Sequence, residues 1–242
     1  MRIAIISDIH SNLEALQKSI SIIEENKVDK IICLGDVVGY GANPKECLKI
    51  IHEISSFILL GNHDQAAADV RYTESFTVYA NVAARWTNKI LTESEKELLL
   101  SFPLSIESDG ITYVHASPYR PSEWDYISNY EDAFFNFSYF NNNICFIGHS
   151  HIPEIFMEDY NEYQLVRNSV KLKCMPDKKY IINVGSVGQP RDRDWRLSFG
   201  IFDDKTYEYE NIRSEYDVQS AAKKIVDAGF PHYLANRILV GR

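Results

Sequence analysis

The sequence lacks any long apolar run and any close pair of cysteines. Among its 242 residues no stretch approaches twenty apolar positions, and the run that opens the chain is only four residues long before Ser7 and Asp8. These features argue against a membrane-spanning helix and against a signal peptide. The four cysteines lie far apart with no CxxC spacing, which argues against a disulfide framework or a zinc knuckle. We therefore expect a reducing, cytoplasmic setting and no membrane partner.

The sequence is also short of positive charge. Lys and Arg number 25 against 34 Asp and Glu, which gives a formal charge of −9 and a pI near 5.3. A protein that holds a long nucleic acid by bulk electrostatics needs the opposite balance. We expect no such partner, and any substrate that carries phosphate must be attracted locally. The length suffices for one sizeable core, and no repeat or linker divides the chain, so we expect one domain over residues 1–242.

Apolar periodicity predicts a sheet covered by helices. The first third of the chain alternates short apolar runs with amphipathic segments, beginning with an expected strand at residues 3–6 and a helix capped by Asn12. Asn43 followed by Pro44 predicts the start of the next helix. Asp109-Gly110 predicts a hairpin turn between strands at 105–107 and 111–114.

Other elements are predicted from the same patterns. Further strands are expected at 30–34, 57–60 and 144–147 and, as short strands, within 154–209, with the clearest at 180–184 and 198–202. Helices are expected at about 44–54, within 74–102 with a capping box at Thr92 and Glu95, and at about 217–228 and 231–239, while 116–129 is expected to be a loop.

Reactive side chains follow nearly every apolar run. Open α/β sheets bind ligands outside the carboxyl ends of their strands, and five of the seven histidines fall there. A single polar residue at such a position usually just turns the chain, but so many like groups at one sheet edge would be costly unless a cation binds them. The sequence therefore predicts a metal site from Asp8, His10, Asp36, Asn62, His63, His115, His149 and His151.

The donor set indicates the kind of metal. Imidazole nitrogens with carboxylate and amide oxygens, and no thiolate, suit Mn²⁺, Fe, Zn²⁺, Co²⁺ or Ni²⁺. The candidate ligands are too many for one ion and about right for two, and paired ions about 3.5–4 Å apart are a known arrangement for phosphate ester hydrolysis. Two divalent ions beside Asp8 and Asp36 would leave the pocket positive inside a chain of formal charge −9. That local charge would attract a phosphate.

Five motifs follow one another along the chain: DxH at 8–10, GD at 35–36, GNHD at 61–64, a lone histidine at 115 and GHSH at 148–151. In this order they resemble the motifs of the calcineurin-like metallophosphoesterase superfamily, and in particular of its small bacterial and archaeal branch. NVGSVGQPR at 183–191 is similar to NPGSVGQPR of that branch, with Val184 where Pro is commoner, and 35–44 is similar too. The resemblance implies an α/β fold of two packed mixed β-sheets flanked by helices, a four-layer α-β-β-α sandwich with the metal site at the carboxyl ends of the strands.

The resemblance also implies a role for each motif residue. The first metal would be held by Asp8, His10, Asp36 and His151, and the second by Asp36, Asn62, His115 and His149, so that Asp36 bridges the two ions. His63 would contact the phosphate and assist the leaving group. Asp64 would orient the His63 imidazole and raise its pKa, or alternatively would only cap a helix. Arg191 closes the family-like stretch and is expected to bind substrate with Asn62 and His63.

The function implied by the resemblance is hydrolysis of phosphodiesters or phosphomonoesters by in-line attack of a hydroxide that bridges two divalent ions, with Mn²⁺ preferred in vitro. The expected partner is a small phosphate ester or a nucleotide. A diadenosine-polyphosphate hydrolase, a serine/threonine protein phosphatase and a metal-binding interaction module of the same fold are the alternatives.

Several properties stay open from the sequence. They are the physiological substrate, the native metals, the choice between monoester, diester and anhydride, and whether the chain forms a homo-oligomer. The role of loop 116–129 is also open, because Tyr119, Arg120, Trp124 and Tyr126 either touch substrate or anchor the loop.

Overall fold

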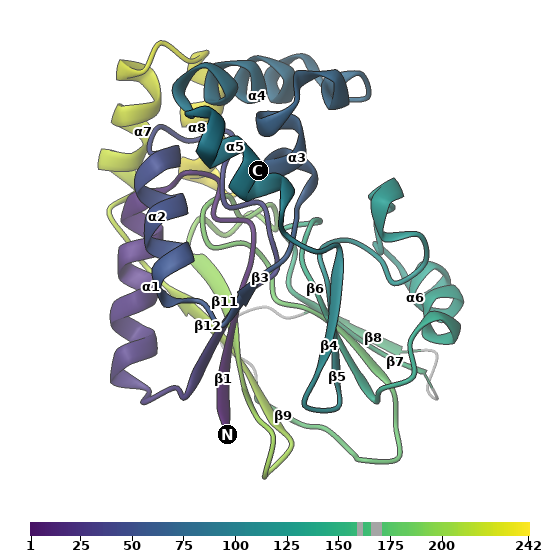
Figure 1. Cartoon of the computed structure of the whole chain (residues 1–242). Helices are drawn as coiled ribbons and strands as arrows, with labels where there is room; N and C mark the ends of the chain where they lie inside the picture. Colours follow the sequence, from purple (N-terminus) through teal and green to yellow (C-terminus); the bar gives the residue numbers. More distant parts are fainter. Residues whose placement is uncertain (159–161, 166–170) are drawn as a thin grey trace.

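The structure of the chain, a computed structural model, describes residues 1–158, 162–165 and 171–242. Two six-stranded mixed sheets pack face to face, and helices cover the outer face of each sheet (Figure 1). This arrangement confirms the predicted α-β-β-α sandwich.

The first sheet contains the strands that open the chain. Their order is β3 (Phe57–Ile58), β2 (Lys30–Cys33), β1 (Arg2–Ile6), β11 (Leu197–Asp203), β12 (Glu208–Ser214) and β9 (Lys171–Lys173). β1, β2 and β3 run parallel, and β11 is antiparallel to β1. The strand predicted at 57–60 is shorter than expected, because Leu60 N–H donates to the carbonyl of Pro103 and not to the sheet.

The second sheet has the order β4 (Ser105–Ser108), β5 (Ile111–Val114), β6 (Ile144–Ile147), β10 (Tyr180–Asn183), β7 (Glu154–Met157) and β8 (Glu162–Leu165). β5, β6 and β10 run parallel. Ser108 pairs with Ile111, which leaves Asp109-Gly110 as the two-residue turn that the sequence predicts. Residues 159–161 and 166–170 of the strand-rich stretch lie outside the described residues.

The helices follow the predicted pattern, with two that the sequence analysis did not name, α3 and α6. Asn12 caps α1 by accepting from Ala15 N–H, and Thr92 and Glu95 form the expected capping box. Asn43 stands at the N-cap position of its helix, but its side-chain oxygen makes no cap hydrogen bond, and its amide nitrogen donates to Glu46. The bounds are α1 (Leu13–Glu25), α2 (Pro44–Ile54), α3 (Asn62–Ala68), α4 (Val78–Ile90), α5 (Glu93–Leu100), α6 (Tyr130–Asn136), α7 (Val218–Asp227) and α8 (His232–Val240), with 3-10 turns at Val70–Thr73, Pro121–Glu123 and Phe137–Tyr139.

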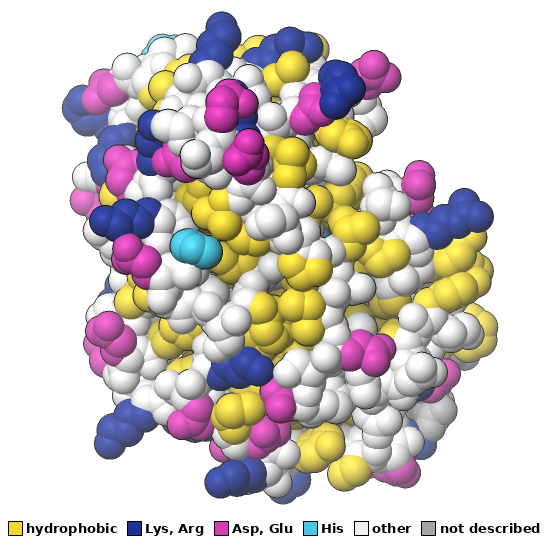
Figure 2. Space-filling view, in the orientation of Figure 1, with side chains coloured by type: hydrophobic (Ala, Val, Ile, Leu, Met, Phe, Trp, Pro, Cys, Tyr) yellow, Lys and Arg dark blue, Asp and Glu magenta, His cyan; other side chains and the backbone are white. Residues whose placement is uncertain are grey.

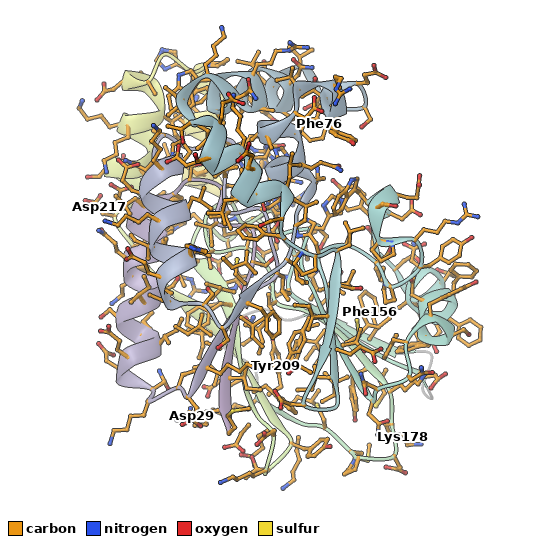
Figure 3. All side chains as sticks on the ribbon, viewed as in Figure 1. Asp29, Phe76, Phe156, Lys178, Tyr209 and Asp217 are labelled. Carbon is orange, nitrogen blue, oxygen red and sulfur yellow. The ribbon has the colours of Figure 1, made fainter. Side chains whose placement is uncertain are left out.

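Three apolar clusters hold these layers together. The middle cluster lies between the sheets and includes Ile5 of β1, Phe146 of β6 and Tyr209 of β12, all fully buried; Tyr209 is labelled in Figure 3. A second cluster joins the first sheet to α1, α2, α7 and α8, and a third joins the second sheet to α6. Burial of each large apolar side chain contributes about 1.5–3 kcal/mol before conformational entropy is counted. The inter-sheet layer therefore fixes the position of one sheet relative to the other.

That packing brings strand ends of both sheets to one end of the sandwich. The loop after β1 contacts the loop after β2 through Asp8 N–H and the carbonyl of Gly35, 3.0 Å apart, and contacts the second sheet's loops through Val187 N–H and the carbonyl of Ser7, also 3.0 Å. Gly148 N–H likewise donates to the carbonyl of His115. The predicted site residues lie on these loops.

The surface carries charges of both signs. Figure 2 shows Lys and Arg scattered among Asp and Glu on one face, around a central apolar area. Among the described residues no helix is both long enough and apolar enough to cross a bilayer.

Candidate metal centre

Two groups of buried His and Asp side chains meet where the loops of the two sheets converge. Asp8, His10, Asp36 and His151 form one group, and Asp36, His115 and His149 form the other. Within each group the nearest ligand atoms all lie within 4.8 Å of one another. Asp36 belongs to both groups, so the two sets share one carboxylate.

The histidine ring nitrogens have a defined orientation. His10 and His151 direct Nδ1 at the backbone carbonyls of Val38 and Gln189, at 3.1 and 2.6 Å, so Nδ1 carries the proton. Their Nε2 atoms, each then a lone-pair donor, face each other at 3.1 Å. Two facing lone pairs repel unless a cation lies between them. His115 is held in the same way, with Nδ1 donating to the carbonyl of Leu34 at 2.9 Å.

The carboxylates divide their oxygens between the protein and the cluster. Asp8 Oδ2 accepts from Ser7 Oγ and from His149 N–H, while Oδ1 lies 3.1 Å from His151 Nε2. Asp36 Oδ1 accepts from the His63 N–H at 2.8 Å. Its Oδ2 lies 3.6 Å from His10 Nε2 and 3.4 Å from His115 Nε2. One oxygen of each carboxylate is thus fixed by hydrogen bonds, and the other faces the histidines.

Unsatisfied buried atoms provide a test of whether metal fits here. Leaving a buried polar atom without a partner costs about 1–3 kcal/mol, and such atoms are few in native proteins. In the part of the chain that the structure describes, five of these atoms belong to predicted ligands: Asp8 Oδ1, Asp36 Oδ2, Asn62 Oδ1, His115 Nε2 and His149 Nε2. All five are atoms that bind divalent cations. The cluster suggests a dinuclear site for divalent metal ions.

The electrostatics favour the metal-binding forms of most ligands. Burial lowers the pKa of His10 and of His151 well below the ordinary range, and lowers the pKa of His149 to about 3. Burial opposes a charged His115, but the charge and hydrogen bond of Asp36, together with the charges of Asp8 and Asp64, raise the pKa of His115 to about 9. Burial by itself would raise the pKa of Asp36, yet the adjacent histidines, His115 first, hold it well below its usual range. Asp36 is therefore ionised.

The ligand loops adopt a strained backbone. Five predicted ligands have left-handed φ angles, namely Asp8 (54°), His10 (49°), Asp36 (52°), His149 (65°) and His151 (61°). Each non-glycine residue in this region costs on the order of 1 kcal/mol or more, and such strain clusters at functional sites. Gly61 and Gly148 allow close approaches at the cluster, because a Cβ at Gly61 would collide with Asp36 Oδ1 and a Cβ at Gly148 would collide with Ser7 Oγ.

The stretch 183–191 supports these loops from behind. Asn183 donates to the carbonyl of Gly148 and to Ser150 Oγ, and Ser186 Oγ donates to the carbonyl of Asp8. The Gln189 carbonyl accepts from His151. The sequence analysis flagged this stretch but gave a role to Arg191 alone, so the positioning residues Asn183, Ser186 and Gln189 were missed. Similarity to a family stretch was the signal that could have found them.

His63 lies at the edge of the cluster, between aromatic rings. Its ring centroid is 4.5 Å from that of Tyr40 and 4.7 Å from that of Phe76, which Figure 3 labels at the helical end of the molecule. Burial lowers the pKa of His63 to about 4. Its Nδ1 has no hydrogen-bond partner within the described ranges.

Asp64 does not contact the His63 ring through a hydrogen bond. Its oxygens accept from Val38 N–H and Gly61 N–H, at 3.0 and 3.2 Å, and the second bond caps α3. Burial, and secondarily the Asp36 charge, raises the pKa of Asp64 to about 7. In this geometry the carboxylate fixes the loops after β2 and β3, which is the helix-cap alternative and not the orienting role.

A cavity of about 300 Å³ opens beside the cluster. Its lining includes Asn62, His63 and Arg191, the three residues predicted to bind substrate, together with Tyr40 and Arg237, which the sequence analysis did not name. Tyr40 lies in the family-like stretch 35–44, whereas no sequence signal marks Arg237.

Loop 116–129 covers the other histidines. The Tyr126 ring stacks on that of His149 with centroids 4.1 Å apart, and the Trp124 ring lies 5.9 Å from that of His115. Tyr119 instead packs against Phe135 and anchors the loop.

Two other arginines, Arg196 and Arg213, form ion pairs and do not line the cavity beside the cluster. Arg196 pairs with Asp194, and Asp192 of the same turn pairs with Arg213. The alternating charges after Arg191 therefore form a paired turn.

Comparison with known proteins places the chain in a family. Residues 1–206 match the calcineurin-like phosphoesterase superfamily domain. An uncharacterized protein of Methanocaldococcus jannaschii is 41% identical over 245 residues, covering 99% of this chain and 98% of its own length. The crystal structure of a metallophosphoesterase from Sphaerobacter thermophilus superposes with a TM-score of 0.91 at 36% identity, covering 100% of this chain and 99% of the other. A hypothetical protein from Pyrococcus horikoshii shares the fold, with a TM-score of 0.80 at 19% identity, covering 100% of this chain and 98% of the other. The chain belongs to the calcineurin-like phosphoesterase superfamily.

Proposed function

We propose that this chain is a metal-dependent phosphoesterase that hydrolyses phosphomonoesters or phosphodiesters of small molecules. One observation carries the proposal: the buried ligand atoms of Asp8, Asp36, Asn62, His115 and His149 have no hydrogen-bond partner among the described residues. A cationic group would give these clustered lone-pair atoms the partner that they lack. Membership of the superfamily supports the same reaction class.

The residues divide into two ligand sets. Asp8, His10, Asp36 and His151 would hold the first ion, and Asp36, Asn62, His115 and His149 the second. Two divalent ions supply Lewis-acid activation of the phosphate and an activated water. The backbone carbonyls behind His10, His115 and His151 accept from Nδ1 of each ring, which leaves Nε2 as the nitrogen that would bind an ion.

His63 would serve the leaving group. It lines the cavity beside the cluster, its Nδ1 is free of partners in the described structure, and its lowered pKa of about 4 makes the imidazole neutral at pH 7. A neutral ring donates an N–H to the departing oxygen and stabilises the charge that develops there. Arg191, on the same cavity wall, would bind phosphoryl oxygens of the substrate.

The cavity size favours a small substrate. A volume of about 300 Å³ lies at the low end for small-molecule pockets, which argues against the protein phosphatase alternative. Mn²⁺ as the preferred ion in vitro and a cytoplasmic location are part of the same proposal.

The test is hydrolysis of 4-nitrophenyl phosphate beside bis(4-nitrophenyl) phosphate by metal-stripped protein reloaded with Mn²⁺. We expect stripping to abolish turnover, and reloading to restore it. His63→Ala should lower kcat by about 100-fold or more with two ions still bound. The matched control is His52→Ala, an exposed histidine on α2, which should keep full activity.

A different outcome would support the interaction module. If wild-type protein binds two ions per chain but hydrolyses neither ester nor a dinucleoside polyphosphate, the proposed function is wrong.

A further inference from the structure

The cavity beside the metal centre contains two arginines, and no acidic side chain among the described residues forms an ion pair with either of them. Arg191 is the last residue of the stretch 183–191, and Arg237 projects from α8. We propose that Arg191 and Arg237 form a second anion site, and that the substrate carries a second phosphoryl group, one held at the metals and the other at this arginine pair. The inference rests on the proposed function and specifies its substrate class.

Tyr40 connects the pair to the metal centre. The guanidinium carbons of Arg191 and Arg237 lie 5.9 and 5.5 Å from the centroid of the Tyr40 ring. The same ring lies 4.9 Å from that of His10 and 4.5 Å from that of His63. One tyrosine therefore separates the arginines from a metal ligand and from the leaving-group histidine. A phosphoryl group bound at the arginines would be a close neighbour of one bound at the metals.

The charges of the two arginines are uncompensated by acidic side chains. No Asp or Glu side chain in the described ranges lies within 4.0 Å of either guanidinium, whereas Arg71, Arg196 and Arg213 each pair with an aspartate. Like charges gathered in a half-buried cavity repel, and burial together with the Arg191 charge lowers the pKa of Arg237. Such an arrangement is stabilised when an anion binds.

Both guanidinium groups retain free donors. Arg191 donates from Nη2 to Gln189 Oε1 at 3.0 Å, and its buried Nε has no partner in the described chain. Arg237 donates from Nε to the backbone oxygen of Arg242 and also hydrogen-bonds with the Tyr40 side chain, which uses only part of the five N–H donors of its guanidinium. Planar N–H forks of this kind match the oxygens of a phosphoryl group.

Aromatic side chains pack around Arg237. The rings of Tyr79 on α4 and Tyr233 on α8 stack with centroids 4.4 Å apart, and Arg237 lies 5.7 Å from the Tyr233 centroid. Arg237 is thus packed between the rings of Tyr40 and Tyr233. Preorganised donors lose less entropy on binding than mobile ones, which favours a specific site over a diffuse positive surface.

The first experiment measures binding alone. Isothermal titration calorimetry of Mn²⁺-loaded protein compares propane-1,3-diphosphonate with propylphosphonate, and methylenediphosphonate with methylphosphonate. The first pair imitates two ester-linked phosphates and the second an anhydride. We expect wild-type protein to prefer the diphosphonate of at least one pair, and Arg237→Ala to reduce that preference by about 10- to 100-fold. Arg237→Lys should recover part of it.

The matched control is Arg85→Ala. Arg85 is an exposed arginine on α4 whose Nε donates to Asn81, and it does not line the cavity. This variant should keep the wild-type preference. An Arg237→Ala protein that melts at the wild-type temperature yet keeps the preference, or that weakens both members of a pair equally, would overturn the second site.

The second experiment compares kcat/KM for fructose 1,6-bisphosphate with fructose 6-phosphate and for ADP with AMP. Wherever wild-type protein prefers the compound with two phosphoryl groups, Arg237→Ala should lower the ratio of the two kcat/KM values, mainly by raising KM for that compound. Different results would overturn the phosphoesterase proposal and the anion-site proposal. If wild-type protein hydrolyses none of these compounds but binds a diphosphonate through Arg237, the phosphoesterase proposal fails and the anion site stands. If it hydrolyses esters with no preference and Arg237→Ala changes no ratio, only the anion site fails.

Discussion

Metal binding should raise the thermal stability of this protein, and Asp36→Asn should remove most of that gain. An ion that binds only the folded chain adds about 2.7 kcal/mol to the free energy of unfolding when free metal is a hundred times the dissociation constant. For a chain of this size, 1 kcal/mol corresponds to about 2–4 °C in Tm. Each ion should therefore raise the Tm by about 5–10 °C, and two ions by about 10–20 °C.

The shared carboxylate makes the two sites separable. Asp36 Oδ2 faces His10 Nε2 on one side and His115 Nε2 on the other, at 3.6 and 3.4 Å. Asp36→Asn keeps the shape of the side chain but loses the charge at both sites, so most of the Mn²⁺-dependent shift should disappear. His10→Ala and His115→Ala each remove a ligand from one set only, and each should lose about half of the shift. His52→Ala, on the surface of α2, should retain all of it.

The assay is differential scanning calorimetry of EDTA-treated protein titrated with Mn²⁺, with bound metal counted by mass spectrometry. Equal losses in Asp36→Asn and His10→Ala would refute the bridging role of Asp36. A Tm that does not move when EDTA-treated wild-type protein receives Mn²⁺ would refute the reasoning from the orphaned ligand atoms.

Three further predictions concern groups around the centre. Gly61→Ala should destabilise the fold by about 1–3 kcal/mol, measured by urea unfolding, because the added Cβ would collide with Asp36. The same variant should abolish the Mn²⁺-dependent rise in Tm, whereas Gly110→Ala, in the open hairpin turn, should keep it. Burial raises the pKa of Glu154 from 4.5 to about 7, so the folded state holds that proton more tightly and the free energy of unfolding should fall as pH rises between these values. Glu154→Gln should remove about 2–3 kcal/mol of this pH dependence, measured by urea unfolding at pH 5 and pH 8. Asp64→Asn should cost about 1–2 kcal/mol in the same assay, because the amide nitrogen that replaces one carboxylate oxygen cannot accept, so one of the hydrogen bonds from Val38 N–H and Gly61 N–H is lost; an unchanged midpoint would contradict the capping role.

Much of the fold follows from local sequence signals, and the exceptions have physical causes. Asn12, the Thr92 capping box and Asp109-Gly110 act through neighbours in sequence, so their patterns predicted the structure correctly. β3 is shorter than its apolar run because a contact with distant Pro103 ends the pairing. The helix of Tyr130–Asn136 is only seven residues long and was not predicted.

In the candidate site too, the residues that follow strands could be predicted from the sequence, whereas those placed by distant contacts could not. Its ligand candidates lie directly after strands, where the topology of parallel strands makes their convergence predictable. Arg237 lies on a helix near the end of the chain, and its place in the cavity depends on how α8 packs against the first sheet. No periodicity or motif encodes that contact, so sequence reasoning missed it.

The distribution of ligands between the sheets explains why neither half of the sandwich suffices. Asp8, His10 and Asp36 follow strands of the first sheet, whereas His115, His149 and His151 follow strands of the second. Each proposed ion therefore takes ligands from both sheets. The apolar layer between the sheets fixes their separation, and the ions would join them at one end, so metal binding and inter-sheet packing are energetically linked. The strained φ angles of the ligands fit this view, since strain persists only where surrounding structure imposes it.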